Sequence, residues 1–148
     1  MEKNKKAFDN AIHPCLWFDG NAKQAAEFYC SVFKNSKITT DTPIVVYFEL
    51  NGNKFMGLNA GPMHKFNEAI SFVVNCDTQE EIDHYWNSLT ADGGKQVECG
   101  WLKDKFGVSW QIVPTIIGKL MTTPEKAQKV MAVIMKSKKF VIEELVNA

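Results

Sequence analysis

Two stretches of the sequence, 56 positions apart, repeat the same order of strand-like and helix-like segments. A shift of 56 positions places Leu16 on Phe72 and Tyr29 on Tyr85, so the apolar positions of a strand and of a helix coincide. Few residues are identical between the two stretches. Self-similarity at a fixed offset nevertheless outweighs single-residue signals, and we interpret the chain as an internal duplication of one β-α-β-β-β unit.

The first unit covers residues 11–60. It begins with the β-forming run Ile12–Phe18, and Asn21 is in position to cap a helix over residues 22–33, whose apolar residues recur at helical spacing. Asn51-Gly52 predicts a tight hairpin turn, because both residues tolerate a positive φ. The three strands expected after the helix are Lys37–Asp41, Ile44–Leu50 and Lys54–Asn59.

The second unit covers residues 68–114 and repeats this order. A strand over Ala69–Asn75 precedes an amphipathic helix over Thr78–Leu89, which carries Ile82, Tyr85 and Trp86 on one stripe. Phe106-Gly107 marks the turn between the last two strands. The three strands expected after the helix are Lys95–Cys99, Trp101–Lys105 and Val108–Val113.

Residues 115–148 lie outside the repeat. Thr123-Pro124 is a typical helix start, with threonine as the N-cap and proline at the first helical position. A second short helix is expected after Lys139. Both helices carry apolar stripes that need a surface to cover, either in the same chain or in a partner subunit. The stripe residues are Val130, Met131, Ile134, Phe140 and Leu145.

We therefore expect an α+β protein, a single domain over residues 1–148, in which the two modules curve their sheets into a shared half-barrel cleft. Strand alternation places Leu16 and Phe18 under the first helix, and Ile70, Phe72 and Val74 under the second. Trp101 is expected at the rim of the cleft. The residues expected to face the cleft are His13, Cys15, Trp17, Tyr47, Glu49, Phe55, Gly57, Asn59, Ala69, Ser71, Val73, Ser109, Gln111 and Val113.

Composition excludes several classes of function. Lys and Arg total 17, as do Asp and Glu, so the chain lacks the positive charge that nucleic-acid or anionic-membrane binding requires. The longest apolar runs fall far short of the roughly 20 residues of a membrane span. Residues 1–10 are polar, are expected to fray and do not resemble a signal peptide. The four cysteines form no C-x-x-C pair, so we expect reduced thiols in the cytoplasm.

Several segments of the chain are similar to those of a known family. These segments are His13–Ala22, Phe28-Tyr29 with Phe33, Phe55–Pro62, Phe66–Phe72 and Gly100–Pro114. On these segments the chain resembles the vicinal oxygen chelate (glyoxalase/bleomycin resistance) superfamily, and within it the PhnB-like proteins, also labelled "3-demethylubiquinone methyltransferase-like". The resemblance covers about residues 11–146, including the tail from Met131 to Leu145.

The resemblance also implies where a metal ion would bind. Enzymes of the superfamily hold a divalent ion with side chains from the first, fourth, fifth and eighth strands, positions that correspond here to His13, Gly57, Ala69 and Gln111. Glycine and alanine supply no ligand, and two neutral ligands without a carboxylate would hold such an ion weakly. We therefore expect no metal and no other cofactor.

The methyltransferase label has no support in the glycine pattern. The nine glycines stand at positions 20, 52, 57, 61, 93, 94, 100, 107 and 118, and none forms the G-x-G turn between a strand and a helix. The common doubly wound methyltransferases use that turn to approach their cofactor. The label therefore follows from the resemblance and not from the chemistry of the residues.

The function that the sequence favours is binding of a small organic molecule in the cleft, by a homodimer. One alternative is a divalent-metal lyase or dioxygenase-type enzyme. Another is a vestigial cleft in a protein that works through its dimer surface. Cys15, two residues from His13, is interpreted as a small buried thiol rather than an activated one. The expected substrate-binding residues are His13, Trp17, Tyr47, Asn59, Ser71, Trp101 and Gln111.

Overall fold

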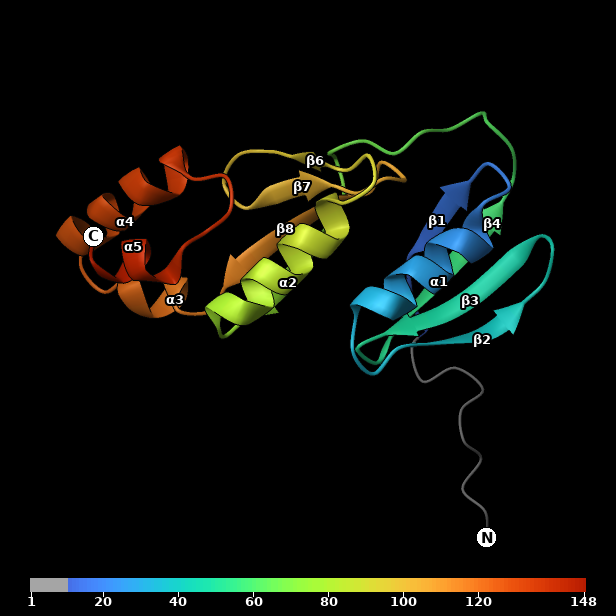
Figure 1. The fold of residues 1–148 in the computed structure, drawn as a ribbon, viewed down its shortest axis with the longest axis horizontal. Coiled ribbons are helices and arrows are strands. Elements are labelled where there is room, and N and C mark those ends of the chain that lie inside the picture. The colour runs from blue at the N-terminus through green and yellow to red at the C-terminus, as the bar shows by residue number, and fades with distance from the viewer. Residues whose placement is uncertain (1–10) are drawn as a thin grey trace, which may run out of the picture. The chain divides into compact units, whose positions relative to one another are not determined.

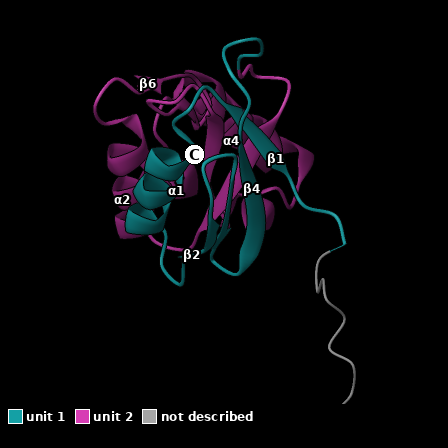
Figure 2. Cartoon of the chain, turned by 90° about the vertical axis from the view of Figure 1, so that its right-hand side faces the viewer, with its two compact units in different colours: residues 1–65 teal, residues 66–148 magenta. Residues whose placement is uncertain are grey.

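The computed structural model describes residues 11–148, so the expected frayed tail lies outside the described residues. The chain divides into two compact units, residues 1–65 and residues 66–148, which are coloured separately in Figure 2. Each unit contains one four-stranded sheet and one long helix against it (Figure 1). The expected β-α-β-β-β duplication is therefore confirmed, and each unit is described by itself.

The first unit contains one parallel and two antiparallel strand pairs. Its sheet has the order β1-β4-β3-β2, in which β1 and β4 are parallel and the other neighbours are antiparallel. Asn51 and Gly52 have φ values of 49° and 79°, so the predicted hairpin turn is confirmed. The elements are β1 (Cys15–Phe18), α1 (Ala22–Val32), β2 (Lys37–Asp41), β3 (Val45–Leu50) and β4 (Asn53–Asn59).

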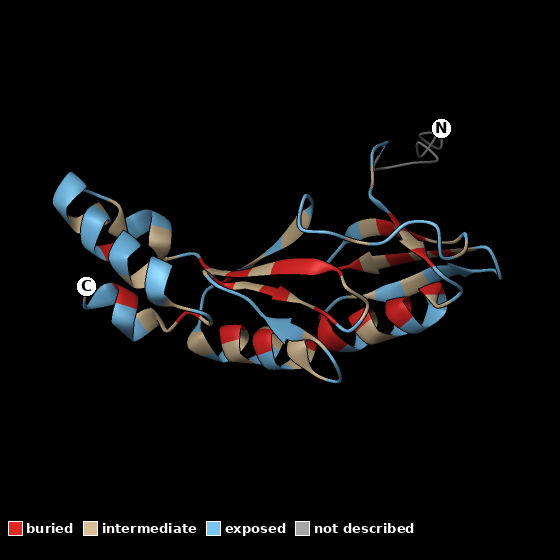
Figure 3. Cartoon of the chain, turned by 90° about the horizontal axis from the view of Figure 1, so that it is seen from above, coloured by how far each residue is buried: buried red, intermediate tan, exposed pale blue. Residues whose placement is uncertain are grey.

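Alternate strand residues of the first sheet pack under α1. Leu16 and Phe18 of β1 are buried, as predicted, and so are Val46 and Phe48 of β3. Figure 3 shows the buried positions of the chain in red. Tyr29 of α1 stacks on Phe48 with 6.1 Å between ring centroids. This layer of aromatic and branched side chains is the core of the first unit.

The prediction for β4 was wrong by one face. Phe55 and Gly57 were expected to face away from the helix, but both are buried on the helix side, where Phe55 stacks on Phe48 at 5.4 Å. The two-residue turn pairs Leu50 with Asn53, so Phe48 lies opposite Phe55 and shares its face. A shift of one residue in a strand moves every side chain to the other face.

The second unit repeats this topology, but the first two strands after its helix are shorter than those of the first unit. Its sheet has the order β5-β8-β7-β6, and β5 and β8 form the parallel pair. The strand expected over Lys95–Cys99 ends early, because Cys99 and Gly100 adopt positive φ values of 58° and 79°. The elements are β5 (Ser71–Cys76), α2 (Gln79–Thr90), β6 (Lys95–Gln96), β7 (Trp101–Lys103) and β8 (Ser109–Pro114).

Two details of the second core differ from prediction. Tyr85 is only half-buried, whereas Tyr29 is fully buried, because Trp86 fills the space under α2 beside Ile82. Ile70 was expected to pack inward, but it precedes β5 in a bend and is 73% exposed. Phe72 and Val74 are half-buried.

A buried carboxylate organises the turn between β7 and β8. Asp104 is 3% exposed and accepts hydrogen bonds from the backbone N–H groups of Phe106 and Val108, at 2.8 and 3.0 Å. Its other oxygen accepts the indole N–H of Trp110 at 2.9 Å. The carboxylate therefore holds the hairpin closed and fixes a core tryptophan.

The C-terminal extension contains three helices with their own small core. Thr123 caps α4 by accepting a hydrogen bond from the backbone N–H of Lys126, as its place before Pro124 predicts. Val130, Phe140 and Leu145 are buried together, while Met131 is exposed. The helices are α3 (Ile117–Leu120), which the sequence analysis did not predict, α4 (Pro124–Lys136) and α5 (Ile142–Val146).

The extension packs on its own unit. The backbone N–H groups of Cys99 and Gly100 donate to the carbonyls of residues 137 and 138, both at 2.8 Å. The Gln79 side chain of α2 donates to the Phe140 carbonyl at 3.1 Å and accepts from the Ile142 N–H at 2.8 Å. The sequence analysis left open whether these helices cover a surface of the same chain or of a partner subunit. The structure shows contacts with the same chain.

Candidate functional site

The face of each sheet opposite its own helix, here called the open face, carries most of the predicted site residues. On the first sheet, Tyr47 and Glu49 of β3 lie on this face, as predicted from strand alternation. Their register partners on β4 are Met56 and Lys54. The open face of the first sheet carries Cys15, Trp17, Val45, Tyr47, Glu49, Lys54, Met56 and Leu58.

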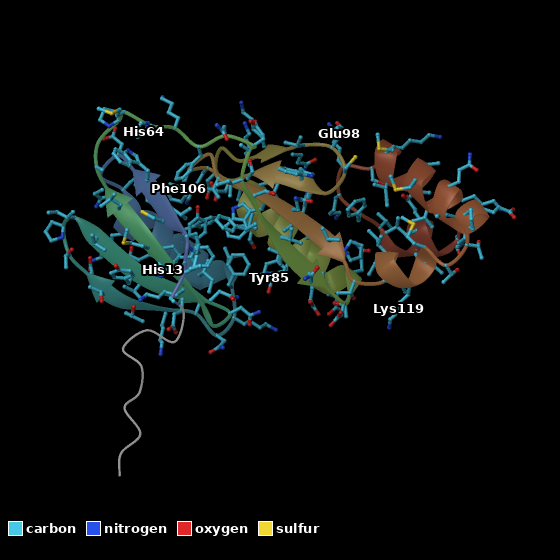
Figure 4. All side chains as sticks on the ribbon, turned by 180° about the vertical axis from the view of Figure 1, so that it is seen from behind. His13, His64, Tyr85, Glu98, Phe106 and Lys119 are labelled. Atoms are coloured by element: carbon cyan, nitrogen blue, oxygen red, sulfur yellow. The ribbon has the colours of Figure 1, made fainter. Side chains whose placement is uncertain are left out.

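His13 and Tyr47, which were each predicted to face the cleft, contact each other. The two rings contact edge to face, with 5.9 Å between their centroids, and the Lys54 ammonium lies 4.7 Å from the centre of the Tyr47 ring. The Nδ1 atom of His13 is buried and has no hydrogen-bond partner within residues 11–148. His13 is labelled in Figure 4, where it precedes β1. A cation, an aromatic ring and an unused imidazole nitrogen therefore lie together.

Trp17 is contacted by the segment that follows β4. Its indole N–H donates to the carbonyl of Gly61 at 2.8 Å, and the imidazole of His64 meets its ring edge to face, with 4.7 Å between centroids. His64 is labelled in Figure 4. The indole N–H of Trp17 is therefore satisfied within its own unit, and only the ring of Trp17 is left to contact a bound molecule.

Cys15 and Asn59 differ from prediction. Cys15 is exposed rather than buried, and partial desolvation raises the pKa of its thiol, so the thiol is not activated. Asn59 points to the helix side instead of the open face. Its Oδ1 accepts from the Ala22 N–H at 2.9 Å, and its Nδ2 donates to the Pro43 carbonyl at 3.0 Å. The Asn59 side chain therefore has a structural role at the start of α1.

The open face of the second sheet brings together three predicted site residues. Gln111 of β8 donates from Nε2 to the Ser71 hydroxyl of β5 at 2.9 Å. Trp101 of β7 is the register partner of Gln111 in the antiparallel pair, so both side chains leave the sheet on the same side. An amide, a hydroxyl and an indole thus occupy neighbouring positions on three adjacent strands.

Two further residues complete this face. Ser109 is 1% exposed, and its hydroxyl has no hydrogen-bond partner in the described part of the chain. It lies between its register partners Ser71 on β5 and Lys103 on β7. Lys103, which the sequence analysis did not single out, forms an ion pair with Glu68. Register alone could have identified Lys103, because it stands two positions from Trp101 on the same strand.

The residues do not fit the divalent-metal site that the resemblance implies. Gly57 lies on the helix side, where a Cβ would stand 3.1 Å from the Cβ of Ala22, and Ala69 lies in a turn before β5. The residues that do occupy the open face of β4 are Lys54, Met56 and Leu58, none of which supplies the imidazole or carboxylate ligand that a hard or borderline divalent ion prefers. No group of three or more His, Cys, Asp or Glu residues within 11–148 is placed to hold an ion. We therefore derive no chemistry through a metal.

Comparison with solved structures identifies the fold. A glyoxalase-related enzyme from Fulvimarina pelagi is 15% identical, with a TM-score of 0.55 over 73% of this chain and 90% of that chain. A fosfomycin resistance protein, FosX, from Listeria monocytogenes is 14% identical, with a TM-score of 0.54 over 82% of this chain and 97% of that chain. At these identities the likeness shows the fold, which is that of the glyoxalase/bleomycin resistance superfamily.

Within that class, the family model of 3-demethylubiquinone-9 3-methyltransferase matches residues 10–113, and the chain belongs to this PhnB-like family. A putative 3-demethylubiquinone-9 3-methyltransferase, the PhnB protein from Bacillus cereus, is 32% identical. The match covers 71% of this chain and 99% of that chain, with a TM-score of 0.64. A comparison with curated proteins finds no match.

The sheet topology bears on the methyltransferase name of the family. Each sheet is mixed, with one parallel pair, whereas a doubly wound methyltransferase has a mostly parallel sheet with helices on both faces. Among the described helices, none is long and apolar enough to cross a membrane.

Proposed function

We propose that the protein binds a small organic molecule on the open faces of its sheets. The observation that carries this proposal is the presence of hydrogen-bonding groups without partners beside aromatic side chains on these faces. Ser109 holds a buried, unpartnered hydroxyl, and His13 holds a buried, unpartnered nitrogen. Buried polar groups are nearly always satisfied in folded proteins, so an unpaired group on a sheet face indicates a ligand.

The residues that we propose to contact the molecule are His13, Trp17 and Tyr47 of the first unit and Ser71, Trp101 and Gln111 of the second. Aromatic rings supply contact area, and the amide and hydroxyl groups orient the molecule. Asn59 is left out, because its amide already bonds Ala22 and Pro43.

Ligand-observed NMR with a library of small aromatic and carboxylate-bearing fragments tests the proposal. We expect some fragments to bind the purified protein and to bind more weakly to Trp17→Ala and Gln111→Ala. Met131→Ala is the matched control, since it truncates an exposed side chain on α4. Failure of the whole library to bind, or equal binding by all three variants, would contradict the proposal and favour a protein that works through its subunit surface.

We further propose that the protein is a cytoplasmic homodimer. The four cysteines are all free within the described residues, which is compatible with a reducing compartment. Light scattering on the full chain measures the assembly directly. A mass near 17 kDa at micromolar concentration would reject the dimer.

A further inference from the structure

The open face of the second sheet carries hydrogen-bond donors that have no acceptor among the described residues of that face. Ser109 has an unpartnered hydroxyl hydrogen. The Ser71 oxygen accepts from Gln111, which leaves the Ser71 hydrogen free to donate, and the Gln111 amide has a second N–H. We call Ser71, Ser109 and Gln111 the donor row.

A cation lies at one end of this row and already holds a carboxylate. Lys103 is the register partner of Ser109, so their Cβ atoms stand about 4.5–5.5 Å apart on one face. The Lys103 ammonium pairs with Glu68, and their side chains are 31% and 59% exposed. Glu68 belongs to the turn before β5, outside the hydrogen-bonded sheet. The Lys103 ammonium lowers the pKa of the Glu68 carboxyl.

We propose that the donor row and Lys103 form a carboxylate subsite, and that Glu68 occupies its cationic end until a ligand carboxylate displaces it. The inference rests on the proposed function and names the chemical class of its ligand. Lys103 would pair with one carboxylate oxygen, and the hydroxyls of Ser71 and Ser109 would donate to the carboxylate.

The charge of the subsite favours a monoanion. Once Glu68 swings away, Lys103 is the single charged group on the strands around the donor row, among the residues that the structure describes. The remaining donors are neutral and suit a planar acceptor with two oxygens. Trp101 lies beside Gln111 and provides apolar contact for the body of the molecule.

Benzoate and benzamide form a matched pair of probes, because they have nearly the same shape and differ in charge. Isothermal titration of the full chain should show tighter binding of benzoate than of benzamide. The variant Lys103→Gln should weaken benzoate binding by about tenfold, which is 1.4 kcal/mol, and should leave benzamide nearly unchanged. The variant Glu68→Gln should strengthen benzoate binding severalfold, because it removes the internal competitor.

The two variants are expected to change benzoate affinity in opposite directions. If the ion pair were only structural, its loss would change benzoate affinity in the same direction in both variants. Weaker benzoate binding by Glu68→Gln would overturn the inference. So would equal affinity for benzoate and benzamide, although the proposed binding function would survive that result. Binding of neither probe would also overturn the carboxylate assignment, while fragments found in the NMR screen would keep the broader proposal. Ser109→Ala should weaken benzoate binding without changing the effect of Glu68→Gln.

Discussion

Asn59, at the end of β4, caps the first turn of α1 by accepting a hydrogen bond from the Ala22 N–H at 2.9 Å. The neighbouring Asn21 makes no such side-chain bond. We predict that Asn59→Ala lowers the free energy of unfolding by about 1–2 kcal/mol, because it leaves the Ala22 N–H and the Pro43 carbonyl without a partner. Asn21→Ala is the control and should cost much less in the same urea titration. Equal losses would mean that Asn21 caps the helix.

Gly57 allows α1 to approach β4 closely. A Cβ at this position would stand 3.1 Å from the Ala22 Cβ and 3.6 Å from the Phe18 ring. We expect Gly57→Ala to destabilise the protein by about 1–3 kcal/mol through overpacking. Gly118→Ala in α3 has open space around its Cβ and should be neutral or stabilising, because alanine favours helix. Thermal unfolding of both variants checks this difference, and a neutral Gly57→Ala would show that α1 can shift without cost.

Asp104 is a buried carboxylate that accepts hydrogen bonds from three N–H groups. Replacing it with alanine leaves the donors of Phe106, Val108 and Trp110 without this acceptor. We expect Asp104→Ala to cost about 3 kcal/mol or more, and Trp110→Phe about 1 kcal/mol. Asp19→Ala, at an exposed position, should stay within about 0.5 kcal/mol of the parent protein. Denaturant titration measures all three.

The contact between Lys139 and Asp83 should make the stability depend on pH. The hydrogen bond from Lys139, 2.7 Å away, and a second from Gln79 lower the pKa of the Asp83 carboxyl. A carboxyl group whose pKa is lower in the folded state stabilises the protein at pH values above its ordinary pKa of about 4. This stabilisation is lost as the pH falls through the pKa of the folded state. The stability gap between the parent protein and Lys139→Ala should therefore be constant near neutral pH and close in acid. Because Asp83 is partly exposed, we expect a gap below about 1 kcal/mol. A gap that widened in acid would contradict this assignment.

The thiols should differ in accessibility to alkylating reagents. Cys76 is fully buried, and desolvation raises its pKa to about 12, so it stays protonated at neutral pH. Cys15 is exposed. We expect iodoacetamide to label Cys15 well before Cys76 in the native protein, as peptide mass spectrometry would show. Cys15→Ser should remove the early labelling, and rapid modification of Cys76 would contradict its burial.

The sequence predicts much of the secondary structure, because those signals are local. The apolar spacing in α1, the Asn51-Gly52 turn and the Thr123-Pro124 start of α4 each lie within a few consecutive residues. The four-residue helix α3 is too short to show a period, and it was missed. Tyr85 was paired with Tyr29 by the repeat, but Trp86 is larger and takes the buried place.

The errors at the candidate site have a different origin. The face of Phe55 and Gly57 followed from the predicted hairpin, because a two-residue turn after Leu50 places Phe55 opposite Phe48. Alternation along β4 alone does not determine which face Phe55 occupies. The contact between Asn59 and Ala22 joins residues 37 positions apart, and the ion pair of Lys103 with Glu68 depends on how a turn folds over a sheet. Neither contact follows from local spacing.

The C-terminal extension is held to the second unit by contacts on both sides of α4, since α3 packs in the same small core as Phe140 and Leu145. Within the extension, the chain between α3 and α4 passes through the exposed residues Thr122 and Thr123. A protease that cuts there would break the chain without removing what holds the piece in place. The nicked protein should therefore migrate as one species on a native gel and separate into two fragments only in denaturant, so native chromatography alone would not reveal the cut.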